Sequence, residues 1–71
     1  MQNNIKAVCF NNAGDDRKIW MYVNQIFAIS EPLYDSEKAE GLSYIHSNSG
    51  TIWCVKNTPE EIMLKIGWKE E

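Results

Sequence analysis

The sequence predicts a single α+β domain, residues 1–71: a strongly bent antiparallel sheet of about five short strands, packed on one face by one C-terminal helix. Three observations support this fold class. Short segments alternate apolar and polar side chains with the period of two that is typical of strands. Turn-forming residues separate these segments, and a helix-capping signature follows the last one. The 71 residues suffice for one core and are too few for a second domain.

The first two strands form a predicted hairpin. Residues 5–10 alternate and predict the first strand. Residues 11–16 are rich in Asn, Gly and Asp, which tolerate the backbone of close turns. The second strand, 18–23, carries Trp20 and Tyr22 on one face, and its other face is also apolar.

A third strand is predicted over residues 26–30, after a brief break at 24–25. It stops before Pro32, because proline cannot donate a hydrogen bond to a strand ladder. Residues 34–41 form the most polar stretch of the chain. We expect an exposed loop there, and this loop is the segment most prone to disorder.

The last two strands are predicted at residues 42–47 and 51–56, around a tight turn. Asn48 and Gly50 lie in this turn and provide the positive backbone angles that tight hairpins need. These two strands therefore form a second hairpin.

A helix is predicted over residues 59–66. Thr58 is the expected N-cap, Pro59 occupies the first helical position, and Glu61 is placed to complete a capping box. Gly67 is expected to end the helix. One helix covers only one face of such a sheet, so the second apolar face requires a closed barrel, a partner or a ligand.

The charges exclude binding to duplex nucleic acid. The chain has 7 Lys and Arg against 10 Asp and Glu, a formal net charge of −3. Its only adjacent basic pair, Arg17 and Lys18, directly follows Asp15 and Asp16. Displacement of counterions from phosphates depends on clustered cations, and this chain has none.

We expect a cytoplasmic protein without membrane contact. The longest apolar run, residues 26–29, has four residues, far fewer than the roughly 18 to 20 that span a bilayer. The first four residues lack the cationic and apolar segments of a secretion signal. Cys9 and Cys54 lie inside apolar strand segments, which predicts small buried thiols and no disulfide framework.

Few residues could carry catalysis or bind a metal. His46 is the only histidine, and with Cys9 and Cys54 it offers three soft ligands or a Cys-His nucleophile pair. No Cys-x-x-Cys or His-x-x-x-His spacing is present, and the isolated glycines form no phosphate-binding loop. We interpret the three residues as structural, and we expect no catalytic residue, no bound metal and no cofactor.

Aromatic side chains are the most informative feature of the sequence. The strand segments carry Trp20, Tyr22, Tyr44 and Trp53. Such rings fill a small core or a subunit interface. Alternatively, they stack bases, as aromatic platforms do in oligonucleotide-binding barrels. Because few basic residues accompany them, the sequence favours core or interface.

Two apolar residues face away from the main apolar stripe of the predicted helix. Leu64 lies on its outer side, and Trp68 follows four residues later. One interpretation is that this pair forms a second contact surface, apart from the main apolar stripe of the helix. The alternative is that the pair folds back over the sheet edge.

Three features between Tyr22 and Ile66 form a pattern that covers about two-thirds of the chain. They are Val23-Asn24 ahead of Ile26 and Ile29, the stretch Ser43-Tyr44-Ile45-His46-Ser47-Asn48-Ser49-Gly50, and the stretch Val55-Lys56-Asn57-Thr58-Pro59-Glu60-Glu61-Ile62. This pattern resembles the small flagellar and swarming-motility FlbD family and similar short proteins often encoded in prophages. The resemblance implies a β-rich fold and a non-enzymatic role.

The sequence therefore predicts a small non-enzymatic interaction module or regulator that binds a protein partner and self-associates. The candidate interaction residues are Trp20, Tyr22, Tyr44, Trp53, Leu64 and Trp68. The alternative is a small-ligand or nucleotide binding protein that uses the aromatic strand face. A ligand site of that kind would combine one or two rings with convergent polar groups such as Asn24, His46 or Lys56.

Overall fold

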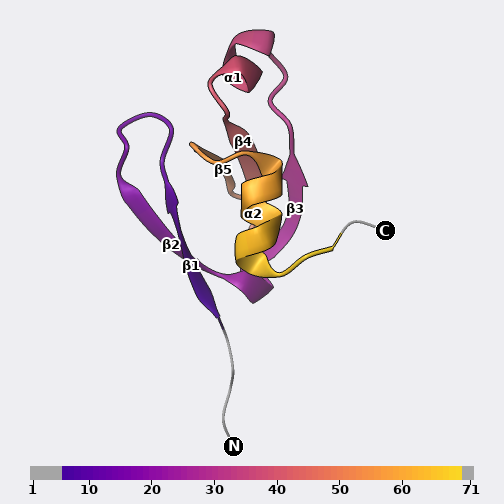
Figure 1. Ribbon diagram of the computed structural model, residues 1–71. Coiled ribbons are helices and arrows are strands. Elements are labelled where there is room, and N and C mark those ends of the chain that lie inside the picture. The colour runs from indigo at the N-terminus through magenta and orange to yellow at the C-terminus, as the bar shows by residue number, and fades with distance from the viewer. Residues whose placement is uncertain (1–5, 70–71) are drawn as a thin grey trace, which may run out of the picture.

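The computed structural model describes residues 6–69 and has the predicted α+β fold, with five short antiparallel strands and a C-terminal helix (Figure 1). Two short helical segments, one of them a single 3₁₀ turn, interrupt the strand order. The elements in chain order are β1 (Ala7–Asn11), β2 (Lys18–Tyr22), η1 (Val23–Gln25), β3 (Ile26–Ser30), α1 (Asp35–Ala39), β4 (Ser43–Ser47), β5 (Ile52–Val55) and α2 (Pro59–Ile66).

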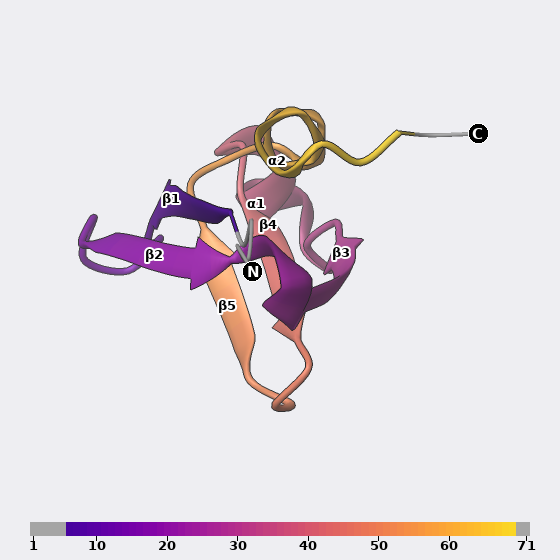
Figure 2. The same ribbon diagram turned by 90° about the horizontal axis from the view of Figure 1, so that it is seen from below.

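The strands form two sheets where the sequence suggested one bent sheet. β1 pairs with β2, and β4 pairs with both β3 and β5. A single bridge between Asn12 and Val55 joins the sheets. Beside this bridge, the Lys56 N–H donates to the Asn11 carbonyl at 2.8 Å. The strand order is therefore β2-β1-β5-β4-β3, with a sharp bend where β1 leaves β5 (Figure 2).

Helix α2 closes the core over the inner side of this bend (Figures 1 and 2). It buries Ile62 and Ile66 against residues from both sheets. The buried apolar cluster comprises Val8, Phe10, Ile26, Ile45, Val55, Ile62 and Ile66. Burial of these side chains is the main favourable term that joins hairpin, sheet and helix into one domain.

Both ends of α2 follow the predicted signals. The Thr58 hydroxyl accepts a hydrogen bond from the Glu61 N–H at 3.2 Å, and the Glu61 carboxylate accepts one from the Thr58 N–H at 2.8 Å. Gly67 has a φ of 83°, the left-handed conformation that ends helices. The predicted bounds, N-cap, capping box and stop are all confirmed.

The stretch 34–41, expected to be a loop, contains the short helix α1. The Tyr34 carbonyl accepts hydrogen bonds from the Glu37 and Lys38 N–H groups, which closes its first turn. The Tyr44 hydroxyl of β4 donates to Glu37 Oε1 at 3.0 Å, and Lys38 Nζ lies 3.9 Å from Glu31 Oε1. These contacts with residues outside the segment favour a helical turn that its polar composition alone does not predict.

Strand β3 contains a register shift between Ile26 and Ala28. The shift turns both Ile26 and Ile29 toward the core, although regular alternation would place them on opposite faces. Phe27 lies at the shift and is 62% exposed.

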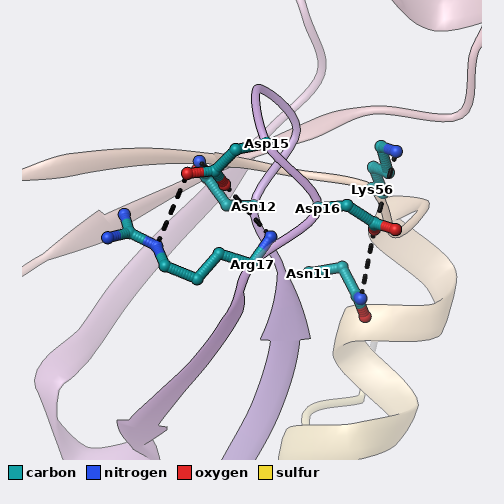
Figure 3. A network of polar contacts seen from close by, with 6 residues as sticks. All are labelled: Asn11, Asn12, Asp15, Asp16, Arg17 and Lys56. Atoms are coloured by element: carbon teal, nitrogen blue, oxygen red, sulfur yellow. Dashed lines mark hydrogen bonds and ion pairs between the residues drawn. The ribbon is translucent and has the colours of Figure 1, made fainter.

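A polar network fixes the β1–β2 turn (Figure 3). Asp15 Oδ1 accepts hydrogen bonds from the Asn12 side chain at 2.8 Å and from the Arg17 N–H at 3.0 Å. These donors favour the carboxylate and hold the pKa of Asp15 below its ordinary value. Asp16 adopts a φ of 62°, and Lys56 Nζ lies 3.5 Å from its carboxylate, which ties the turn to the residue after β5.

Candidate interaction surface

The β1–β2 hairpin carries two uncovered aromatic rings on its outer face. In the ladder, Trp20 lies opposite Cys9, and Tyr22 lies opposite Ala7. Directly opposed residues of antiparallel strands project to the same face, so these four side chains share one surface. Trp20 is 65% exposed and Tyr22 is 57% exposed. We call the surface of Ala7, Cys9, Trp20 and Tyr22 the outer hairpin face.

The opposite face of the hairpin belongs to the core. Val8 and Phe10 are buried there, and Met21 packs against the same cluster. Side chains of a strand alternate between faces, so the burial of this set leaves Trp20 and Tyr22 in solvent.

The four strand aromatics do not form the single face that the ligand-binding alternative requires. Tyr44 lies opposite Cys54, whereas Trp53 lies opposite Ile45, so Tyr44 and Trp53 project from opposite faces of their hairpin. Trp53 packs against the core cluster. The sequence predicts that both rings belong to one hairpin. The register of its two strands is what places the rings on opposite faces.

Tyr44 has a structural partner. Its hydroxyl donates to the Glu37 carboxylate, and this hydrogen bond is the largest cause that raises the pKa of Tyr44. The bond connects β4 to α1.

Leu64 and Trp68 lie on a different element from the outer hairpin face. Leu64 projects from α2 and is 83% exposed. Trp68 follows the left-handed Gly67, and its N–H donates to the Met63 carbonyl at 3.0 Å. Leu64 therefore lies in α2 and Trp68 directly after its stop, and neither belongs to the strand that carries Trp20 and Tyr22.

The outer face of the three-stranded sheet brings His46 together with groups that the sequence did not single out. His46 Nε2 lies 2.9 Å from Ser30 Oγ, and the Phe27 ring meets the imidazole edge to face with centroids 6.1 Å apart. Ile52 lies opposite His46 and is 58% exposed. In the sequence, Ile26 and Ile29 are three residues apart, a spacing that regular strand alternation does not give to two residues on one face. This spacing could have predicted the register shift at which the exposed Phe27 lies.

The three soft side chains are divided between the sheets. Cys9 belongs to β1, while His46 and Cys54 are diagonal neighbours on β4 and β5. Both thiols are free, as expected, and both are half-buried where the sequence predicted buried thiols. Burial raises the pKa of Cys54 and lowers its thiolate fraction at neutral pH. Within residues 6–69, no group of three or more His, Cys, Asp or Glu side chains could hold a metal ion.

A shallow hollow of about 190 Å³ lies at the start of α2, apart from all of these rings. Pro32, Leu42 and Pro59 line it together with Glu31, Lys38, Gly41, Thr58 and Glu60. The polar groups named for a ligand site, Asn24, His46 and Lys56, do not line it.

Comparisons of the chain with family models, with curated proteins and with solved structures found no match. The resemblance to the FlbD family therefore stays a prediction. No helix in the described part of the chain has the length and apolar character that crossing a membrane requires.

Proposed function

We propose that the protein is a small non-enzymatic interaction module or regulator that self-associates and binds a protein partner through the outer hairpin face. The observation that supports this proposal is the exposure of Trp20 and Tyr22 side by side on one regular strand. Fully burying one such side chain is worth roughly 1.5 to 3 kcal/mol. A twofold interface repeats each contact, so these rings could supply much of the stability that so small a core lacks.

The proposed setting is the cytoplasm, and the proposed role is that of a regulator or a phage or prophage accessory protein. The FlbD-like pattern supports only the non-enzymatic character of this role. Two free cysteines and no disulfide in the described residues support a reducing compartment.

A second candidate function is the binding of a small ligand or nucleotide at the outer face of the three-stranded sheet. The observation that favours it is the grouping of an exposed ring, Phe27, with the polar pair Ser30 and His46. A ring beside convergent polar groups is the composition of many ligand sites.

Nuclear magnetic resonance of the ¹⁵N-labelled chain distinguishes the two functions. We expect dilution from about 500 μM to about 10 μM, a range that spans a modest interface, to shift the Trp20 and Tyr22 resonances most. Addition of nucleotides should then leave the His46 signals unchanged. Spectra independent of concentration, together with shifts at Phe27 and His46 on nucleotide addition, would support the second function.

A further inference from the structure

The outer edge of β2 presents a row of unpaired backbone groups. The Val23 N–H donates to the Lys6 carbonyl, and the Asn12 N–H donates to the Arg17 carbonyl. Hydrogen-bonded pairs alternate along an antiparallel ladder, so Ile19 and Met21 direct their backbone groups to β1. The N–H and C=O groups of Lys18, Trp20 and Tyr22 consequently point away from β1. Among residues 6–69, no segment pairs with them (Figure 1).

The two outer edges of the strand order differ in their protection. β3 carries a bulge and ends before Glu31 and Pro32, and bulges and prolines discourage edge pairing. β2 is regular, and Ile19 to Tyr22 contain no charge, proline or glycine. An apolar, regular edge strand is a template for another strand.

We propose that a second copy of this chain occupies the β2 edge, pairing its own β2 antiparallel to the first around a twofold axis at Trp20. This inference rests on the proposed self-association and adds the arrangement of the two β2 strands in the dimer. Among twofold registers, the one centred on Trp20 pairs all five residues of β2 with those of its copy. It also matches every outward N–H of one strand to an outward C=O of the other.

The side chains of β2 are complementary to themselves in this register. Lys18 of each copy lies directly opposite Tyr22 of the other, on the face where the two Trp20 rings meet. An ammonium group beside an aromatic ring is a favourable pair. On the other face, Ile19 lies opposite Met21, and both side chains are only half-buried within one copy. Edge pairing would cover both.

Hydrogen exchange of individual amides tests the proposed pairing. At about 10 μM the Lys18, Trp20 and Tyr22 amides should exchange as unbonded groups, and at about 500 μM their protection should rise at least about tenfold. The Ile19 and Met21 amides should be protected at both concentrations, because they bond to β1. Sedimentation equilibrium on the same samples measures association independently.

The outcomes of these two measurements separate edge pairing of β2 from self-association by another geometry. Concentration-dependent protection in the alternating pattern supports edge pairing. Association without protection of the Trp20 amide overturns edge pairing and leaves self-association through the rings. Absence of association at both concentrations overturns both. Protection that appears only after a different protein is added assigns the edge to that protein's strand and overturns the second copy as its occupant.

Charge variants at Tyr22 test the register. Tyr22→Glu places a carboxylate opposite Lys18 of the other copy, whereas Tyr22→Lys places like charges together. We expect the dimer of Tyr22→Glu to be about tenfold tighter than that of Tyr22→Lys, since the cross-strand pair occurs twice. The double variant Lys18→Glu/Tyr22→Lys should restore association. Equal affinity of both single variants, with no rescue, would contradict this register.

Discussion

Cys9 and Trp20 lie directly opposite each other in the β1–β2 ladder, on the hairpin face that points to solvent. An interface that packs onto this face, and not only beside the outer edge of β2, therefore also covers the Cys9 thiol. In a Cys54→Ser variant, which leaves one thiol, we expect the rate constant for labelling Cys9 with a thiol reagent to fall as protein concentration rises. Stopped-flow absorbance measures this rate. A rate constant that stays the same from low to high concentration would argue against burial of this face.

The reciprocal cap of α2 predicts a stability effect. Thr58→Ala removes the hydroxyl that accepts from the Glu61 N–H, and loss of such a cap costs roughly 0.5 to 2 kcal/mol. Urea denaturation of the wild type and the variant measures the difference. Thr58→Ser keeps the acceptor and is the matched control, so it should stay close to wild type. Equal stability of Thr58→Ala and wild type would mean that the cap contributes nothing.

The β1–β2 turn predicts a pH dependence. The Asn12 side chain and the Arg17 N–H lower the pKa of Asp15 in the folded state. Its contribution to stability is therefore present above the pKa of an unfolded aspartate, about 3.9, and is lost as pH falls through the lower folded pKa. Asp15→Asn should flatten the fall in stability in this acidic range. An unchanged profile of stability against pH in this variant would contradict the assigned role of the turn.

The contact between Tyr44 and Glu37 tests whether α1 is docked on β4. Glu37 raises the pKa of Tyr44, so the contribution of this pair is present below the unfolded tyrosine pKa of about 10 and is lost as pH rises through the folded pKa. Titration of the tyrosine ring carbons by nuclear magnetic resonance should show Tyr44 ionising at a higher pH than in Glu37→Gln. Identical Tyr44 titrations in the two proteins would show that the contact is not formed in solution.

Local signals predicted most of the fold, and long-range contacts decided the rest. The bounds of α2 depend on residues adjacent in sequence, from Thr58 to Gly67, and were predicted fully. The helical turn of α1 was missed: its side-chain contact with the next strand joins Glu37 to Tyr44, seven residues along the chain, and the polar composition of the turn does not reveal that contact.

The candidate site divides in the same way. The alternation in β2 predicted that Trp20 and Tyr22 share a face, because side-chain period is a local property. The register of β4 against β5 places Tyr44 and Trp53 on opposite faces of their hairpin. Residue types alone do not specify which residues of the two strands lie opposite each other.

Sedimentation equilibrium tests self-association through the outer hairpin face most directly. The matched control for Trp20→Glu is Tyr34→Glu, because both parent side chains are 65% exposed and Tyr34 lies outside β2. We expect wild type and Tyr34→Glu to be oligomeric at about 100 μM, well above the micromolar range of a modest interface, and Trp20→Glu to be monomeric. A monomeric wild type at this concentration, or a Trp20→Glu variant that associates as strongly as wild type, would contradict the account.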